Sequence, residues 1–452
     1  MNITAIEALL AEQHINKIKV GGFDLDGVLR GKYISKEKFL SAVKDGFGFC
    51  DVIFGWDCGD NLYDQGEFTG WHTGFPDLVA RLDTETFRAV PWEPRTAFAL
   101  ADFYQKDGTP LPFCPRQTLK RIVARAEAMG FVPRMAAEYE FFVFEETPES
   151  VHQKEFRGLR PESPGMFCYS LLRASARQEF IHLLMDSLAD FGVQVEGLHT
   201  ETGPGAFEAC IQYDSALAAA DKAGIFKLAV KELATRKGLL ASFMAKWSQE
   251  MPGCGGHIHQ SLADAETGAN AFADPNGQYG CSEVARRYLA GQQQALPELM
   301  PLICPTINSY KRLVPGFWAP TTATWGIENR TNALRLIPGT SPKATRIETR
   351  VVGADACPHL AMAACLAAGL HGIQNRLEPT PPTAGNAYAE SQAPTLPRSL
   401  AAATDRMRQS ALAREWFGEP FVSHVCMTRD WECREFEKAV TDWELRRYFE
   451  II

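Results

Sequence analysis

Arginines gather among apolar residues between positions 308 and 350, a setting typical of a binding site. They alternate with valine, leucine, isoleucine, tryptophan and phenylalanine, and they are Arg312, Arg330, Arg335, Arg346 and Arg350. A guanidinium group in such surroundings is costly unless an anion meets it, and its planar fork matches carboxylates and phosphates. The pattern therefore predicts a site for an acidic small molecule together with a polyphosphate. A set of surface salt bridges is the alternative.

Glutamates at strand spacing form a second chemical group. Glu138 and Glu140 are two residues apart in a Phe-rich run, so their side chains leave the same face of a strand. A Gly-Pro-Gly sequence between Glu201 and Glu208 predicts a hairpin that brings these two carboxylates together. For the first pair taken alone, a solvated strand edge is the alternative.

Together with Glu348 and His257, these glutamates predict a metal site. Carboxylates gathered in one cleft cannot all be ionised without cations, and oxygen ligands with one imidazole suit Mg²⁺ or Mn²⁺. His259 shares a strand face with His257 and is equally compatible with a hydrogen-bonded core histidine.

Other catalytic patterns are missing from the sequence. It has neither GxxxxGK[ST] nor GxGxxG, so a nucleotide must be held by metals and arginines instead of a glycine-rich loop. No Ser/His/Asp or Cys/His spacing indicates a nucleophilic enzyme.

Composition narrows the class of protein further. The 452 residues are 46% hydrophobic and 22% charged, as in an ordinary globular protein, and the net charge of −9 argues against a nucleic-acid partner. Twelve cysteines without a CxxC pair indicate free thiols in a reducing cytoplasm, with no zinc site. No apolar stretch is long enough to span a bilayer and no leader is visible, so we expect a soluble cytoplasmic protein without a membrane partner.

Hydrophobic periodicity predicts a mixed α+β chain of two domains, 1–108 and 109–452, divided in the linker-like stretch 106–112. In the first domain we expect a helix at 3–14, a hairpin at 18–34 that turns at Asp26 and Gly27, and a strand followed by a polar loop over 51–64. In the second domain we expect strands that carry Glu138 and His257 and another at 239–247. The predicted helices there are 115–129, 173–191, 215–237, 356–376, 398–411 and 430–449, with a proline-rich loop at 378–397.

Six motifs occur in the order found in the glutamine synthetase family: EYEFF, HTETGPGAFE, GGHIH, NSYKRLVPG, the ENRT…LR run and RIETR. DLDGVLRGK and FGWD extend the match to the N-terminal region, so the chain resembles this family over nearly its whole length. The resemblance implies a β-grasp-like N-terminal domain and a catalytic domain with a curved antiparallel sheet flanked by helices. It also implies a ring of subunits, commonly a dodecamer, with active sites between neighbours. A phosphagen-kinase-like phosphotransferase is disfavoured because the match includes the N-terminal domain.

The same resemblance implies roles for individual residues. It assigns two or three Mg²⁺ or Mn²⁺ ions per site, one held by Glu140, Glu201 and Glu208 and another by Glu138, His257 and Glu348. Glutamate would be bound by Arg312 and Arg350, with the backbone near Gly253 receiving its amino group. The phosphates of ATP would be held by Arg335, Arg346 and a catalytic Arg330, and the nucleotide would also contact Ser261 and Glu196. Asp57, contributed by a neighbouring subunit, would complete the amine site as a second catalytic residue.

Two positions depart from the ammonia-using members of the family. Trp318 stands where their PGYEAP motif has a glutamate that accepts a proton from ammonium, and Met166 stands near a position where they commonly have tyrosine. Both changes add apolar surface, which suits an alkyl or aryl amine. Pro252-Gly253-Cys254 also replaces the family's NGSG sequence, which leaves a main-chain contact. Glu328 either compensates as an acid or orients an arginine.

We therefore expect an ATP-dependent ligase that joins the γ-carboxylate of L-glutamate to an organic amine through γ-glutamyl phosphate. Ordinary glutamine synthetase, which uses ammonia, is the first alternative. A non-catalytic structural descendant is the second.

Overall fold

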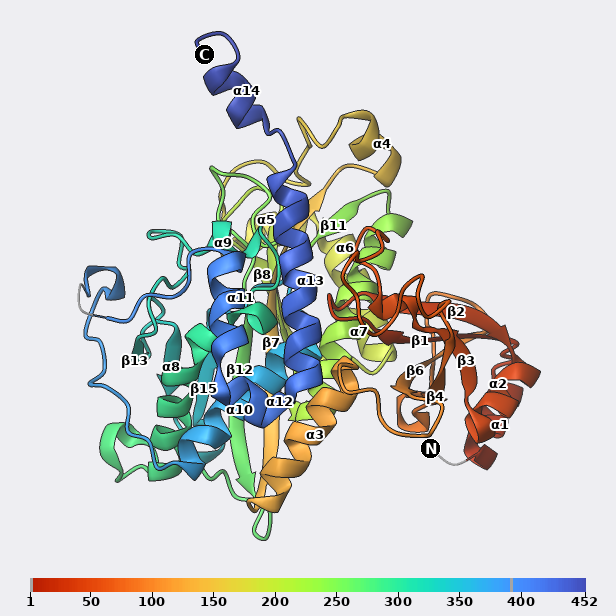
Figure 1. The fold of residues 1–452 in the computed structure, drawn as a ribbon, viewed down its shortest axis with the longest axis horizontal. Coiled ribbons are helices and arrows are strands. Elements are labelled where there is room, and N and C mark those ends of the chain that lie inside the picture. The colour runs from red at the N-terminus through yellow and green to blue at the C-terminus, as the bar shows by residue number, and fades with distance from the viewer. Residues whose placement is uncertain (1–2, 391–392) are drawn as a thin grey trace.

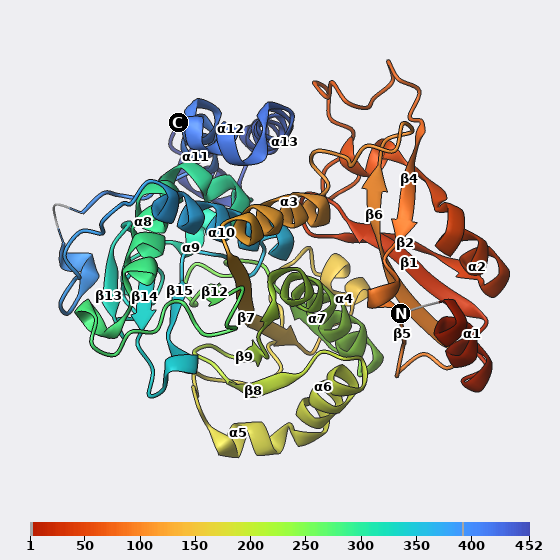
Figure 2. The same cartoon turned by 90° about the horizontal axis from the view of Figure 1, so that it is seen from below.

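The computed structural model describes residues 3–390 and 393–452, which form two β-sheets with surrounding helices (Figure 1). The first sheet has the strand order β2-β1-β6-β4-β3, with β5 paired to β6. Its strands are β1 (Lys17–Phe23), β2 (Leu29–Ser35), β3 (Phe47–Cys50), β4 (Asp77–Leu82), β5 (Arg88–Ala89) and β6 (Thr96–Tyr104). Helices α1 (Ile3–Glu12) and α2 (Lys36–Asp45) lie on the side of this sheet away from the rest of the chain (Figure 2).

The second sheet is larger and has the order β13-β14-β15-β12-β7-β9-β8, with β10 and β11 paired to β7. All its pairs are antiparallel except β13 with β14. The strands are β7 (Phe131–Phe144), β8 (Val195–Thr200), β9 (Ala206–Ile211), β10 (Asp214–Ser215), β11 (Leu240–Ser242), β12 (Gly256–Asp264), β13 (Trp325–Ile327), β14 (Leu334–Ile337) and β15 (Arg346–Thr349).

Helices surround this second sheet (Figure 2), and the last of them extends away from the body of the chain at its C-terminal end (Figure 1). They are α3 (Pro115–Ala128), α4 (Pro148–Gln153), α5 (Leu171–Ala176), α6 (Gln178–Asp190), α7 (Ala216–Arg236), α8 (Glu283–Ile303), α9 (Ser309–Arg312), α10 (Pro358–Gln374), α11 (Leu400–Gln409), α12 (Ala411–Phe417), α13 (Glu419–Glu437) and α14 (Asp442–Tyr448). Among the described residues, no helix is both long and apolar enough to cross a bilayer.

Small residues allow α8 and α10 to approach closely in the centre of the helical layer. A Cβ atom added at Gly291 would lie 2.1 Å from the carbonyl oxygen of Ala368, and one added at Gly372 would lie 2.0 Å from that of Arg287. Both glycines are therefore required by backbone contact. The Ala-rich sequence of α10, buried along most of its length, serves the same close packing.

Much of the predicted secondary structure is confirmed. The hairpin at 18–34 is β1 and β2, with Gly27 at a positive φ of 75° in the turn. Helices α3, α7 and α10 match predicted helices, as do β7 and β12 for the strands that carry Glu138 and His257. The division into domains at residue 108 stays a prediction, and it falls in the segment between β6 and α3.

Several predicted elements are wrong. The strand expected at 51–64 is a 3-10 turn, Asp51–Phe54, because buried Asp51 accepts a hydrogen bond from the Thr69 hydroxyl at 2.6 Å instead of joining a sheet ladder. The helix expected at 173–191 breaks at Arg177, and the strand at 239–247 is limited to β11. The helix expected at 430–449 is two helices, because the Thr441 side chain caps a new start at α14.

Helix α8 was not expected from the sequence, since prolines normally end helices and α8 contains Pro297 and Pro301.

The remaining predicted segments differ less from the structure. The loop at 378–397 contains a short 3-10 turn, Ala387–Ala389, and its residues 391–392 lie outside the described part of the chain.

A buried ion network joins the first sheet to helices of the larger, C-terminal part of the chain. Arg116 of α3, 1% exposed, donates hydrogen bonds to both oxygens of Asp221 on α7 at 2.7 Å and to Asp102 on β6 at 2.8 Å. His359 of α10 lies 2.8 Å from Asp221. Burial opposes ionisation of Asp221, but the charge of Arg116 holds the pKa of this carboxyl well below its ordinary value. The network ties β6 and helices α3, α7 and α10 to one guanidinium group.

Replacing Arg116 should destabilise the fold strongly. Arg116→Met leaves buried carboxylates without a counter-charge, so we expect a loss of about 3–5 kcal/mol in the free energy of unfolding, measured by urea titration. Arg125→Met on the same helix is the control, because Arg125 pairs with Glu415 at the surface and should cost about 1 kcal/mol or less. Equal effects of the two substitutions would contradict this account of the network.

Candidate active site

Strand register brings the predicted carboxylates to one place on the second sheet. Glu140 on β7 is opposite Glu208 on β9, and Glu138 on β7 is opposite His257 on β12. On the other side of β12, His259 is opposite Glu348 of β15. Because alternate residues of a strand share a face, these side chains meet in one cleft.

The acidic side chains surround two imidazoles at short distances. His257 Nδ1 lies 3.3 Å from a Glu138 oxygen and 3.6 Å from a Glu348 oxygen, while its Nε2 lies 3.9 Å from Glu140. His259 Nε2 lies 3.4 Å from Glu138. His259 therefore belongs to this cluster, and the core-histidine alternative is not needed to explain it.

Three groups of ligand atoms are close enough to hold a metal ion among the described residues, with oxygen and imidazole donors only. They are Glu140, Glu208 and His257; Glu138, His259 and Glu348; and His199, Glu201 and Glu208. The six predicted metal ligands thus all belong to one cluster. Its partition differs from the predicted one, because His257 joins Glu140 and Glu208, and His199 joins Glu201 and Glu208.

Opposing electrostatic effects act on the cluster. Burial raises the pKa of Glu208 to about 7, and the charges of Glu138 and Glu140 add to the rise although His199 opposes it. Burial acts on Glu348 in the same direction, but the charge of Arg350 lowers the pKa of Glu348 to about 2. Glu348 is therefore held ionised by arginine, whereas Glu208 lacks a sufficient counter-charge.

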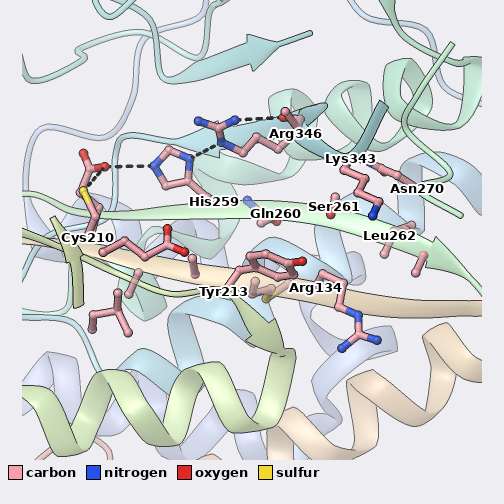
Figure 3. A pocket seen from close by; sticks show the side chains of 18 of the residues that line it. Arg134, Cys210, Tyr213, His259, Gln260, Ser261, Leu262, Asn270, Lys343 and Arg346 are labelled. Atoms are coloured by element: carbon pink, nitrogen blue, oxygen red, sulfur yellow. Dashed lines mark hydrogen bonds and ion pairs between the residues drawn. The ribbon is translucent and has the colours of Figure 1, made fainter. Parts of the chain in front are cut away.

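Two adjoining cavities open on either side of this cluster. The first, about 700 Å³, runs along β7 and β12 and contains Glu196 and Ser261 (Figure 3). The second, about 630 Å³, is lined by five of the predicted metal ligands together with Gly253 and Trp318. The five ligands are Glu138, Glu140, Glu201, Glu208 and His257. Both are lined by Glu138, Cys210, His259 and Arg346, so the cavities meet at these residues.

The arginines occupy different positions around the cavities. Arg330, Arg335, Arg346 and Arg350 line the second cavity. Arg335 donates to Glu348 at 3.1 Å and also pairs with Glu328, which matches the arginine-orienting alternative for Glu328. Arg346 donates from Nε to His259 Nδ1 at 3.2 Å, as Figure 3 shows.

Four predicted site residues do not line either cavity. One is Glu348, which is buried and pairs with Arg335 and Arg350. Arg312, 3% exposed, donates to the carbonyl oxygens of Val351 at 2.9 Å and Arg350 at 3.0 Å, behind the cavity wall. Asp57, in the N-terminal part of the chain, accepts a hydrogen bond at 3.1 Å from Trp431 Nε1 on α13 of the same chain. Met166 is half exposed and lies outside the two cavities of the single chain, so its place in the amine pocket stays a prediction.

Other residues reach the second cavity without having been predicted. Cys168 and Tyr169 line it in place of Met166, because Tyr169 adopts a positive φ of 56° that turns the loop, and no sequence periodicity signals such a turn. The Tyr169 ring lies 4.3 Å from that of His199, whose Nε2 is 3.1 Å from Glu208. The sequence signal that could have found His199 is its spacing, since it lies two residues before the predicted metal ligand Glu201.

The chain is similar to known proteins over nearly its whole length. The family described as glutamine synthetase, catalytic domain, matches residues 112–448. A type-1 glutamine synthetase of Dictyostelium discoideum is 48% identical, covering 100% of this chain and 87% of that protein. A glutamate–isopropylamine ligase of a Pseudomonas species is 38% identical, covering 100% and 98%. The solved structure of a GmaS/ADP complex has a TM-score of 0.85 at 29% identity and covers 98% of each chain.

Fold and site together define an ATP-dependent ligase that forms carbon–nitrogen bonds. The chain belongs to the glutamine synthetase family. Its α+β fold, with a curled catalytic sheet, is of the glutamine synthetase type.

Replacing Glu208 should change how stability depends on pH. The pKa of Glu208 rises from 4.5 to about 7 on folding, so the folded state binds this proton more tightly and loses stability as pH rises from 4.5 to 7. In metal-free protein, Glu208→Gln should therefore gain about 3 kcal/mol over the unmodified chain at pH 8 and nothing near pH 4. Urea titrations in the presence of a chelator at both pH values measure the difference.

Glu266→Gln, in an exposed turn, is the control and should show no such difference. Added Mg²⁺ or Mn²⁺ should stabilise the unmodified chain more than Glu208→Gln, because only the former keeps the full ligand set. A pH profile unchanged by Glu208→Gln would contradict the electrostatic account.

Proposed function

We propose that this enzyme joins the γ-carboxylate of L-glutamate to an organic amine and releases ADP and phosphate. The observation that carries this proposal is Trp318, which lines the second cavity beside carboxylates and arginines while 60% of its side chain is exposed. An indole at the mouth of a charged cavity offers apolar and cation–π surface to an incoming amine. The relative named as a glutamate–isopropylamine ligase supports the same substrate class.

The donor set fits Mg²⁺ or Mn²⁺. Carboxylate oxygens and imidazoles gather within ligand distance, and burial leaves Glu208 without a sufficient counter-charge, which a cation would supply. We propose that the ions, two or three per site, are held by Glu138, Glu140, Glu201, Glu208, His257 and Glu348, with His199 and His259 alongside. When bound, they would neutralise phosphate oxygens during the reaction.

We place ATP in the first cavity and glutamate in the second. Glu196 and Ser261 line the first cavity, and Arg346 lies where the two meet, so a triphosphate in the first would extend toward Arg346. Similarity to a structure titled as an ADP complex supports this placement. Arg350 and the backbone at Gly253 are proposed to hold glutamate, and Arg312 supports Arg350 from behind through its hydrogen bond to the Arg350 carbonyl oxygen.

The proposed reaction has two steps. A γ-carboxylate oxygen attacks the γ-phosphorus of ATP, which forms γ-glutamyl phosphate and releases ADP. The amine nitrogen then attacks the acyl carbon, phosphate leaves, and the amine loses a proton. Arg330 and Arg335 are placed to stabilise negative charge on the transferred phosphoryl group.

Ammonia is the second candidate nucleophile. The 48% identical relative is named a type-1 glutamine synthetase, and Tyr169 supplies an aromatic hydroxyl in the cavity where Met166 was expected to remove one. The preference for an organic amine therefore depends on Trp318. A non-catalytic descendant is disfavoured because the ligand cluster and the cavity arginines are present together.

Selectivity between amine and ammonia should change with residue 318. We expect the unmodified enzyme to have a kcat/KM at least about tenfold higher for one organic amine than for ammonia, because each buried methylene contributes about 0.8 kcal/mol. Trp318→Glu should move the preference toward ammonia by restoring an acid, whereas Trp318→Phe should largely keep the preference. Coupled ADP-release assays at saturating glutamate and ATP, with a panel of alkyl, hydroxyalkyl, polyamine and aryl amines, measure both. Ammonia outperforming every amine in the unmodified enzyme would refute the proposed substrate class.

We further propose that the chain assembles into a ring oligomer, with Asp57 reaching a neighbour's site. Helix α14 extends away from the body of the chain (Figure 1), and its apolar side chains are exposed, 55% for Trp443 and 85% for Phe449. A second copy of this chain is the proposed partner of that surface.

The free thiols of the twelve cysteines, all in described residues, support a cytoplasmic location.

The oligomer should depend on α14. Light scattering should give a mass many times 50.1 kDa for the unmodified chain, and Trp443→Ser with Phe449→Ser should lower it, since both substitutions remove exposed apolar surface. Arg446→Ser on the same helix should leave the mass unchanged. A fully active monomer would refute the shared-site proposal.

A further inference from the structure

Lys246 is a buried cation without an anionic partner among the residues that the structure describes. It belongs to the segment that connects β11 to β12, and the residue is 7% exposed. Across residues 3–390 and 393–452, no carboxylate lies within ion-pair distance of it, and the charged group that acts on it most is another cation, Arg312. Burial lowers the pKa of Lys246, and the charge of Arg312 lowers it further. An unpaired ammonium group here is costly, whereas a methionine would fill similar space without that cost.

The contacts of Lys246 join three segments. Its Nζ donates to the carbonyl oxygen of Met251 at 2.5 Å, just before the Pro252-Gly253 wall of the second cavity. Its backbone N–H donates to Asn308 Oδ1 at 2.7 Å, and Asn308 Nδ2 donates back to the Lys246 carbonyl oxygen at 2.9 Å. Its Nζ also lies 4.2 Å from the centre of the Phe317 ring.

The Phe317 contact matters because the segment that carries it is otherwise weakly held. Among the described residues, no hydrogen bond joins residues 315–318 to another part of the chain. Phe317 and Trp318 both line the second cavity, and Trp318 has a positive φ of 59°, which is unfavourable for a bulky side chain. The ammonium–ring contact is thus the charged contact that holds this segment against the cavity wall.

We propose that Lys246 is a positioning residue for the nucleophile subsite, acting through Phe317 to hold Trp318 at the cavity. This inference rests on the proposed function in taking the residues around Trp318 as the place where the amine enters. A cation–π contact is stronger when less water surrounds it, and Lys246 is 7% exposed. An alternative is that Lys246 and Arg312 jointly attract the carboxylate of glutamate, and the two alternatives differ in which KM changes.

The test is a double-mutant cycle between Lys246 and Phe317. Lys246→Met and Phe317→Leu should each raise the KM of the preferred nucleophile about three- to tenfold, with the KM values of glutamate and ATP changed less than about twofold. The double variant should be no worse than either single variant, because both remove the same contact. Lys246→Arg, which keeps a cation over the ring, should stay within about twofold of the unmodified enzyme.

Lys311→Met is the matched control. Lys311 is an exposed lysine on α9 whose Nζ lies 5.3 Å from the Phe436 ring, away from the cavities, so its loss should leave all KM values unchanged. Additive effects in the cycle, or a rise in the glutamate KM alone for Lys246→Met, would overturn the proposal. If Lys246→Met does not fold, Phe317→Leu and Lys246→Arg still decide it, because the proposal requires a KM rise in the first and none in the second. A preference for ammonia in the unmodified enzyme would refute the proposed substrate class alone, since the cycle can be measured with ammonia.

Discussion

The structure depends on balancing negative charge in one cleft of the large sheet. Glu348, 1% exposed, lies between Arg335 and Arg350 and within 3.6 Å of His257. These contacts join β14, β15 and β12, and they hold Glu348 ionised despite its burial. Glu208 lies on the far side of the cluster, where the described part of the chain places no arginine in ion-pair contact with it, and it retains its proton to a higher pH. The protein therefore balances the carboxylate on one side of the cleft with arginines and leaves the negative charge on the other side for a bound cation to balance.

The two cavities follow from this division. Arg346 and His259 lie where the cavities meet, so a polyphosphate from one side and a carboxylate from the other can approach the same charges. Behind the second cavity, the cations are structural. Arg312 donates to main-chain carbonyl oxygens, and Lys246 supports Phe317. Gly253 fits between these layers because a Cβ atom there would lie 2.4 Å from the Ala245 carbonyl oxygen and 2.7 Å from the Arg312 side chain.

Sequence reasoning succeeded where periodicity determines geometry and failed where loops do. The spacing of Glu138 and Glu140 places both on one strand face, and the Gly-Pro-Gly turn places Glu201 near Glu208, so the acidic cluster was predictable. Met166 was assigned to the pocket by motif alignment, but Tyr169, three positions later, was missed because its positive φ brings it into the cavity. The partition of ligands between His257 and His259 depends on strand register, which alternation alone does not determine. Helix α8 was missed because two prolines fit inside it once its neighbours are in place.

The most direct test of this account follows the oxygen of glutamate. The enzyme is incubated with ATP, an organic amine and glutamate labelled with ¹⁸O in the γ-carboxylate, and the released phosphate and the amide are analysed by mass spectrometry. If ATP and glutamate react where the cavities meet, one labelled oxygen passes to each phosphate and a γ-glutamylamide forms in equal amount. Unlabelled phosphate, or labelled phosphate without a γ-glutamylamide, would contradict the account.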